Sequence, residues 1–471
     1  MSETFNSCRS FYLEKVFPAA VFLLTLCLKA EFVFRHVSFL GNAATAANIM
    51  AVICEAVVFF VIVFARKTPG LIVLFLNALW MLLSRMLLHD MSLPFAATAC
   101  GMSFIVFALY AGGCCTGEKH CKTMMKILYF EMAALLSAVS AVGILTAVSG
   151  HSVFGIDGII VQTESSVPPL VFVEFFGIHR NISAMYFVCA SGMMLFGLIK
   201  ERNVFTIAAT VITLPLFFVS AALQHCRSAY LAFAVVISIL IFYALRKRTN
   251  AQRPFVKMVA ISCAALLCAV LIYGSFGLCS KAMMDLSQDM RISEETQLDP
   301  EQFDTVSDNR STLSDAPTLT GRTDIWKAAI DVIKEQPGVL LFGQAENDMM
   351  DLVNEKTASP FGHMHNSLMQ QLMLSGAPGF ILYTVFFALL LKRSAAVLLS
   401  KESAGNENAV LAAVLLGVMA YGVLEPMLSY FLPFVSMFFA LASGVFCRRD
   451  NTAEAPTEAA AETQPMCRTD N

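Results

Sequence analysis

Charged residues are scarce in this chain, and their scarcity excludes most soluble protein classes. Asp, Glu, Lys and Arg make up only 14% of the 471 residues, whereas 57% of the residues are hydrophobic. Ordinary soluble domains contain about 25% charged and about 45–50% apolar residues. The formal net charge of −3 is uninformative, because the distribution of the charges matters more than their sum. No nucleic-acid partner is expected. The composition favours a polytopic membrane protein.

Several sequence motifs of soluble enzymes are also missing. The chain contains no GxxxxGK[ST] phosphate loop, no GxGxxG, no HExxH and no Asp-x-Asp pair, and such motifs bind nucleotides or metal ions. None of the fourteen cysteines forms a CxxC pair, which argues against a zinc or redox site. We expect the cysteines to be small residues that face the core or the lipid. No metal and no cofactor is predicted.

About twelve apolar runs are long enough to cross a membrane as helices. Crossing about 30 Å of hydrocarbon takes about 20 residues at a rise of 1.5 Å each. The runs cover residues 16–34, 44–64, 69–89, 93–113, 127–148, 180–199, 204–223, 228–245, 255–278, 366–391, 409–425 and 431–446. We therefore predict an all-α polytopic membrane protein with about twelve transmembrane helices.

Basic residues predict the orientation of these spans. If the N-terminus is cytoplasmic, the even-numbered connections and the C-terminus are cytoplasmic too, and they carry most of the basic residues, as the positive-inside rule requires. These residues include Arg66, Lys67, Lys119, Lys122, Lys126, Lys200, Arg202, Arg246, Lys247, Arg248, Lys392 and Arg393. Both termini are therefore expected in the cytoplasm. The alternative is a signal peptide cleaved within residues 42–48, but Lys29, Glu31 and Arg35 separate that site from the apolar run.

This topology divides the chain into four segments. Residues 1–278 hold predicted helices one to nine, residues 279–365 form a large extracytoplasmic loop between helices nine and ten, residues 366–449 hold helices ten to twelve, and residues 450–471 form a disordered cytoplasmic tail. Residues 285–316 of the loop are acidic and poor in apolar side chains, which is typical of a solvated segment.

The end of the loop has the pattern of an amphipathic helix near residues 323–335. Its apolar side chains recur at helical spacing: Ile325, Trp326, Ala329, Ile330 and Ile333. The sequence Gln-Pro-Gly that follows is a signal that ends a helix. We expect this helix to lie along the outer membrane face or to pack on the spans.

Polar side chains gather at the predicted outer ends of the spans. They are His179, Arg180 and Asn181 before span six, Gln224, His225 and Arg227 before span eight, Arg322 in the loop, and His363, His365 and Asn366 before span ten. Solvation at a helix end is the commoner explanation for a single histidine there. An arginine is more informative, because it costs about 2.5–3.5 kcal/mol at a span centre and its planar fork suits phosphate. Arg227 either extends to the membrane interface or binds an anion.

Three segments resemble, in order, the motifs of the bacterial O-antigen ligase and polymerase superfamily. A short arginine motif at the start of a span is matched by QHCRSAYLAF, an Arg-x-x-x-Trp segment by GRTDIWKAAIDVIKEQPGVLLFGQ, and a His-Asn-x-x-Leu segment by GHMHNSLMQQLMLSGAPGFILY. FFGIHRNISAMYF adds a weaker feature that contains Asn181. The resemblance covers about residues 175–395. Cys226 stands where serine is usual and the turn lacks a Gly-x-Gly, which leaves the choice of acceptor open.

The resemblance implies a GT-C-like membrane glycosyltransferase. Such an enzyme moves a glycan from a polyprenyl-diphosphate carrier, such as undecaprenyl diphosphate, to an acceptor hydroxyl at the outer face of the cytoplasmic membrane, with inversion and without metal. The partners implied are the lipid-linked glycan donor, a glycan or lipid acceptor and membrane lipids. Its active site is extracytoplasmic.

The resemblance also implies roles for individual residues. Arg227 and Arg322 would neutralise the diphosphate leaving group, with Arg180 as a weaker third candidate. Neutral His365 would take the proton of the acceptor hydroxyl. Asn366, His363 and Asn181 would support the site, and only the adjacent Asn366 favours His365 over His363 as the base.

The glycines and the proline after this motif predict a broken helix. Gly376, Pro378 and Gly379 are expected to end the helix after about two turns and to leave a short re-entrant piece. Such breaks occur at membrane depth where backbone lines a cavity.

Two alternatives stay open. A polysaccharide polymerase of the same superfamily differs from a ligase only in its acceptor, which is a second growing glycan. A secondary transporter or flippase would use intramembrane charges as its pathway, and the candidates are Lys29, Glu31, Glu55, Arg85, Glu131 and Glu425. No pair of inverted repeats supports a transporter, and a transporter needs no large polar loop that ends in His-Asn.

Overall fold

The protein is a bundle of long apolar helices. The computed structural model describes residues 2–35, 41–65, 68–88, 91–93, 96, 100–149, 159–164, 170–175, 180–201, 203–224, 226–248, 254–287, 322–357, 362–400, 406–426 and 433–448. Most of the acidic segment 285–316, together with His179, His225 and the tail 450–471, lies outside the described residues, so the predictions for them stay predictions.

Among the described residues, nine helices are long and apolar enough to cross a membrane. They are formed by α2 (Phe17–Arg35, preceded by α1, Ser2–Phe11, and the π-helix η1, Tyr12–Val16), α3 (Gly41–Phe59, followed by α4, Val61–Phe64), α5 (Pro69–Leu88), α8 (Glu118–Ser149), α9 (Arg180–Lys200), α10 (Val204–Leu223), α11 (Arg227–Arg248), α12 (Pro254–Ser287) and α18 (Ser367–Leu399). Shorter apolar helices, α7 (Gly101–Cys115), α19 (Asn406–Gly422) and α20 (Pro433–Cys447), occupy the other predicted spans. The predicted all-α polytopic fold is confirmed.

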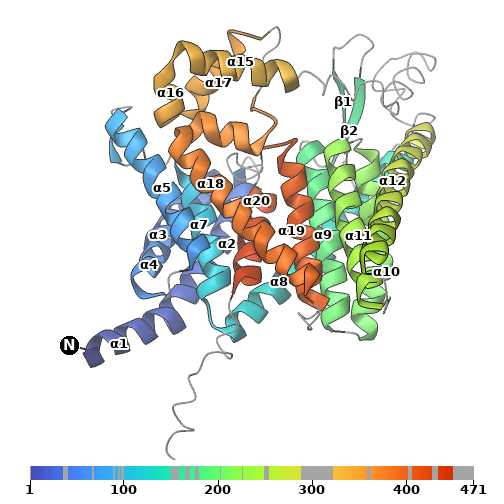
Figure 1. The fold of residues 1–471 in the computed structure, drawn as a ribbon, viewed down its shortest axis with the longest axis horizontal. Helices are drawn as coiled ribbons and strands as arrows, with labels where there is room; N and C mark the ends of the chain where they lie inside the picture. The colour runs from blue at the N-terminus through green and yellow to red at the C-terminus, as the bar shows by residue number, and fades with distance from the viewer. Residues whose placement is uncertain are drawn as a thin grey trace, which may run out of the picture.

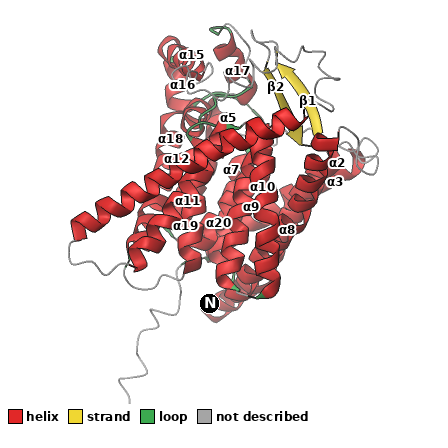
Figure 2. Ribbon diagram, turned by 90° about the vertical axis from the view of Figure 1, so that its right-hand side faces the viewer, coloured by secondary structure: helices red, strands yellow, loops and turns green. Residues whose placement is uncertain are grey.

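The helices differ in how much of their surface lies inside the protein. In α9, 72% of the apolar window is buried, whereas in α12 only 17% is buried. The helix α9 is therefore central, and α12 runs along the outside of the bundle (Figure 2). Large apolar side chains such as Phe130, Phe205 and Leu266 are exposed. In a membrane, such side chains contact lipid chains instead of water.

The chain forms a helical cap over one end of the bundle. The cap consists of α15 (Arg322–Glu335), α16 (Pro337–Phe342) and α17 (Glu346–Asn354), and the N-terminus lies at the opposite end (Figure 1). The helix α15 occupies the residues for which the apolar spacing predicts a helix. It buries Ala328 and Val332, whereas Ile330 is 46% exposed. The sequence analysis placed Ile330 on the apolar face of this helix. The apolar spacing alone did not show that Ala328 and Val332 are buried in its place.

A β-hairpin lies near the cap and is an addition to the predicted fold. Strands β1 (Ile159–Glu164) and β2 (Leu170–Phe175) pair antiparallel, with Ile159 opposite Phe175 and Glu164 opposite Leu170. Both strands fall between the predicted spans 127–148 and 180–199, where the sequence analysis predicts no secondary structure. Figure 2 shows the hairpin at the same end of the bundle as α15 and α17.

The predicted break in α18 is confirmed at Gly376. This residue has φ 63° and ψ −172° inside an otherwise helical run, and a Cβ added there would lie 2.5 Å from the carbonyl of Leu341 in α16. Side chains of α5 satisfy carbonyls before the break: Trp80 Nε1 donates to the Ser375 oxygen at 2.8 Å, and Arg85 Nη2 donates to the Leu374 oxygen at 2.7 Å. The buried Arg85, a candidate for a transport pathway, therefore has a structural explanation.

Gly343 is expected to be required for docking the cap on α18. Its φ of +74° is unfavourable for L side chains, and a Cβ there would overlap the carbonyl of Leu374. We expect Gly343→Ala to destabilise the protein by at least about 1–2 kcal/mol and to lower its thermal unfolding midpoint in detergent. Gly338→Ala is the matched control, because the described residues leave space for a Cβ there. Equal midpoints for the two variants would contradict this role.

Candidate active site

A buried carboxylate, Glu425, lies at the centre of the polar cluster under the cap. Its side chain is 2% exposed, and the residue follows α19 after Val423 and Leu424. Oε1 accepts hydrogen bonds from Arg322 Nη2 at 2.7 Å and from Asn181 Nδ2 at 2.8 Å. Oε2 lies 3.1 Å from His365 Nδ1. One carboxylate thus joins three residues that the sequence analysis singles out separately.

The ends of four helices bring these residues together. Arg322 begins α15, Asn181 is the second residue of α9, His365 comes just before α18, and Glu425 comes just after α19. Tyr421 of α19 also donates its hydroxyl to the backbone oxygen of Asn181 at 2.8 Å. Three of these elements present helix N-termini, whose dipoles favour a negative charge.

The backbone around His365 is held in an uncommon conformation. Among the described residues, His365 is the one non-glycine residue with a positive φ, at 48°. Asn366 accepts from the amides of Leu368 and Met369, each at 2.9 Å, and caps α18. Its Nδ2 also donates to the Val423 oxygen at 2.8 Å. Because strained backbone of this kind collects at functional sites, the conformation favours a functional role for His365.

The cap holds the segment before α18 from the other side. Trp326 of α15 donates its indole N–H to the Met364 oxygen at 2.9 Å, and the amide of Met364 donates to Gln370 Oε1 at 2.9 Å. Ser367 Oγ donates to the backbone oxygen of Glu425 at 2.8 Å. Trp326 thus links the Arg-x-x-x-Trp segment directly to the residue before His365. Arg322 links it to His365 through Glu425.

The two histidines have different partners. Their rings lie 4.0 Å apart, and the backbone amide of His365 donates to His363 Nδ1 at 3.2 Å. His365 Nδ1 faces the carboxylate of Glu425, which can only accept hydrogen bonds. Nδ1 therefore carries the hydrogen, and in the neutral ring Nε2 has the lone pair that a base requires. This distinction was not available from sequence spacing.

Charge and burial act in opposite directions on Glu425. Burial disfavours the charged form of this carboxyl, but the hydrogen bonds from Arg322 and Asn181 and the contact with His365 Nδ1 favour it. Glu425 is therefore a carboxylate near neutral pH, stabilised by the positive charge of Arg322.

Arg227 and Arg180 lie at the edge of this cluster. Cys226, the residue before Arg227, is close enough to Glu425, Arg180 and Arg322 for electrostatic interaction. Arg227 is half-buried at the start of α11 and interacts electrostatically with Tyr273 of α12. No other described residue forms an ion pair or hydrogen bond with its guanidinium. Arg227 therefore differs from Arg322, whose Nη2 is already paired with Glu425.

The match to known families falls on this part of the chain. Residues 211–384 match the family described as O-antigen ligase. These residues are similar to an O-antigen ligase domain. The predicted resemblance to the O-antigen ligase and polymerase superfamily is confirmed over this segment. A search of the curated proteins gave no match.

The site extends beyond both ends of the matched segment. Arg227, Arg322 and His365 lie within the matched residues, whereas Asn181 and Glu425 lie before and after them. The sequence analysis considered Glu425 only as an intramembrane charge and missed its place in the site. The available signal was a carboxylate beside a proline at the predicted outer end of span eleven.

One group of side chains next to the O-antigen ligase motifs has the spacing of metal ligands. Ligand atoms of His363, His365 and Glu425 all lie within 4.8 Å of one another, and no second such group occurs among the described residues. The carboxylate already accepts from Arg322 and Asn181, and a cation there would meet the positive charge of Arg322. A metal-free site stays a prediction.

Proposed function

We propose that the protein is an O-antigen ligase-like glycosyltransferase. It moves a glycan from a polyprenyl-diphosphate carrier to an acceptor hydroxyl at the outer face of the cytoplasmic membrane, by a single inverting displacement that needs no metal. The observation that carries the proposal is the contact of His365 Nδ1 with Glu425, beside arginines at the N-termini of α11 and α15. Both chain termini lie in the cytoplasm in this account.

The proposed reaction uses His365 as a general base. Nε2 takes the proton of the acceptor hydroxyl, the hydroxyl oxygen attacks the anomeric carbon, and the bond from that carbon to the phosphate oxygen breaks. The electron pair leaves with the polyprenyl diphosphate. Glu425 holds the imidazole in the required tautomer and stabilises the imidazolium that forms.

The arginines stabilise the charge that develops on the leaving diphosphate. Among the described residues, no ion pair or hydrogen bond holds the guanidinium of Arg227, which interacts electrostatically with Tyr273. Arg322 Nη2 donates a hydrogen bond to Glu425. Its buried Nε has no hydrogen-bond partner among the described residues. A phosphate oxygen would supply that partner, since buried donors are rarely left unpaired.

Transfer by the purified protein tests the proposed function. The assay contains a polyprenyl-diphosphate oligosaccharide, candidate lipid and glycan acceptors, and a chelator. We expect transfer that the chelator does not reduce. Glycan on a lipid acceptor supports the ligase, and glycan extended on its own carrier supports the polymerase alternative. Failure of all acceptors, together with transport of the donor across vesicles, would overturn the proposal in favour of a flippase.

Arg227 is expected to contribute strongly to binding the diphosphate. A hydrogen bond to a charged group contributes about 1.5–3 kcal/mol, so Arg227→Ala should lower kcat/KM by about 10- to 150-fold. Arg227→Lys should restore only part of the rate, because lysine lacks the planar fork. Lys327→Ala is the matched control, since Lys327 is an exposed cation on α15. Equal rates for Arg227→Ala and the control would rule out this role.

A further inference from the structure

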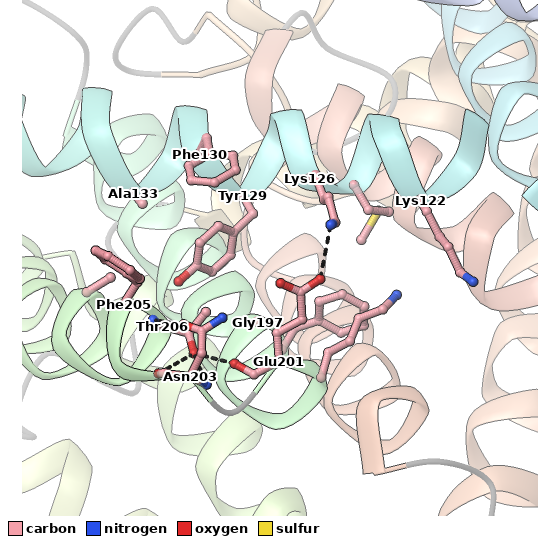
Figure 3. Close-up of a pocket in the computed structure, with 14 residues that line it drawn as sticks. Lys122, Lys126, Tyr129, Phe130, Ala133, Gly197, Glu201, Asn203, Phe205 and Thr206 are labelled. Carbon is pink, nitrogen blue, oxygen red and sulfur yellow. Dashed lines mark hydrogen bonds and ion pairs between the residues drawn. The ribbon is translucent and has the colours of Figure 1, made fainter. Parts of the chain in front are cut away.

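A cavity of about 690 Å³ lies between α8, α9 and α10, far from Glu425. Lys200, at the C-terminal end of α9, lines the cavity. Asn181, at the other end of α9, contacts Glu425. At a rise of 1.5 Å per residue, about 28 Å separates these two ends. Figure 3 shows α8 on one side of the cavity and Glu201, Asn203 and Thr206 facing it. The cavity has no part in the proposed glycan transfer.

The lining side chains of α8 change from basic to apolar along one face. Lys122 and Lys126 are followed by Tyr129, Phe130 and Ala133, and this spacing places all five on the same side of a helix. Deeper in the bundle the face is apolar, and at the end of the bundle it is cationic. A ligand that fits both parts must be amphipathic.

The polar part of the cavity has a positive charge. Its lining contains Lys122, Lys126 and Lys200 but one acidic residue, Glu201. Lys126 pairs with Glu201 at 3.2 Å, and Lys200 Nζ lies 5.2 Å from the ring centroid of Phe196 without an ion pair to any described residue.

Among the described residues, Lys122 forms its ion pair with Glu118 on the surface. Its Nζ lies 2.5 Å from Glu118 one turn earlier in α8, and both side chains are more than half exposed. Such surface pairs contribute little, so a phosphate competes readily for these lysines.

The apolar part of the cavity opens toward the membrane. Phe130 is 66% exposed and Phe205 is 86% exposed, and both lie in helices that are candidate membrane spans. Exposed aromatic side chains on such helices contact acyl chains. A ligand with its charge at Lys200 therefore has its chains beside Phe130 and Phe205.

We propose that this cavity binds one anionic phospholipid. The phosphate group lies among Lys122, Lys126 and Lys200, and an acyl chain lies along Phe130, Ala133 and Phe205. Charge complementarity selects the anionic head group, and the depth of the apolar face selects a lipid over a soluble phosphate. Since about 690 Å³ is within the usual range of about 300–1,000 Å³ for ligand pockets, the cavity holds one head group and part of its chains.

Native mass spectrometry of the delipidated full-length protein tests this site. Phosphatidylglycerol and phosphatidylcholine with the same acyl chains are titrated separately into wild type and Lys126→Gln/Lys200→Gln. The matched control is Lys119→Gln/Lys392→Gln, which removes two exposed cations that do not line the cavity. Ala133→Trp fills the apolar part and leaves the lysines in place. Thermal unfolding midpoints check that each variant is folded.

We expect one phosphatidylglycerol to be retained by wild type and by the lysine control. Each lysine near an anionic lipid raises the affinity for that lipid by about fivefold. Lys126→Gln/Lys200→Gln should therefore weaken the affinity for phosphatidylglycerol by about thirtyfold. Ala133→Trp should also weaken it. Equal retention of phosphatidylcholine, displacement of the lipid by inorganic phosphate, or equal losses in the lysine variant and its control would overturn the proposal. If the lysine variant does not fold, unchanged binding by Ala133→Trp overturns it.

Discussion

Replacing His365 by alanine is expected to lower the rate of glycan transfer by about 10²–10⁴-fold, the usual contribution of a general base. The proton of the acceptor hydroxyl would then have no acceptor held by Glu425. The unfolding midpoint should change little, because His365 is partly exposed and caps no helix. Initial rates of the purified variant in the transfer assay measure the effect.

His363→Ala is the matched control for His365→Ala. The two rings lie 4.0 Å apart, so both changes remove an imidazole from the same small volume. His363 Nδ1 accepts a hydrogen bond from the backbone amide of His365, and such a bond contributes about 0.5–1.5 kcal/mol. We therefore expect a loss of no more than about tenfold. A larger loss for His363→Ala than for His365→Ala would assign the base to His363.

Glu425→Gln is expected to lower transfer by about 10²–10⁴-fold although the histidine is still present. A glutamine side chain no longer fixes the hydrogen on Nδ1 of His365 and no longer stabilises the imidazolium. It also leaves Arg322 with no anionic partner among the described residues, and removing one partner of a buried pair costs about 3–5 kcal/mol of stability. Both the rate and the unfolding midpoint should fall.

An exposed glutamate serves as the control for Glu425. Glu335 pairs with Lys356 at 2.6 Å, but Glu335 itself is 61% exposed. Glu335→Gln should cost no more than about 1 kcal/mol and leave transfer unchanged. If Glu425→Gln lowered only the stability, with full activity in the folded fraction, Glu425 would be a structural residue and not a partner of His365.

The sequence predicted the parts of the site that depend on local pattern. Apolar runs of about 20 residues correctly predicted the spans, and Gly376 correctly predicted the break in α18. The apolar spacing after Arg322 predicted a helix where α15 lies. In each case the signal lies within one turn or one span of the residues that it describes.

The contacts of Glu425 could not be predicted in this way. Its partners His365, Arg322 and Asn181 are separated from it by 60, 103 and 244 positions, and no local pattern states which helix ends meet. Arg322 was predicted to bind the diphosphate, but its Nη2 already donates to Glu425. The sequence did not show this contact. The choice between His363 and His365 required the same tertiary contact.

The central claim is that Glu425 and His365 act as one unit, and a double-mutant cycle on the transfer rate tests it most directly. The four proteins are wild type, His365→Ala, Glu425→Gln and the double variant, compared at equal folded concentration. If Glu425 acts through His365, the double variant should be about as slow as His365→Ala alone. Losses that multiply would show that the two residues act independently, and would contradict the account.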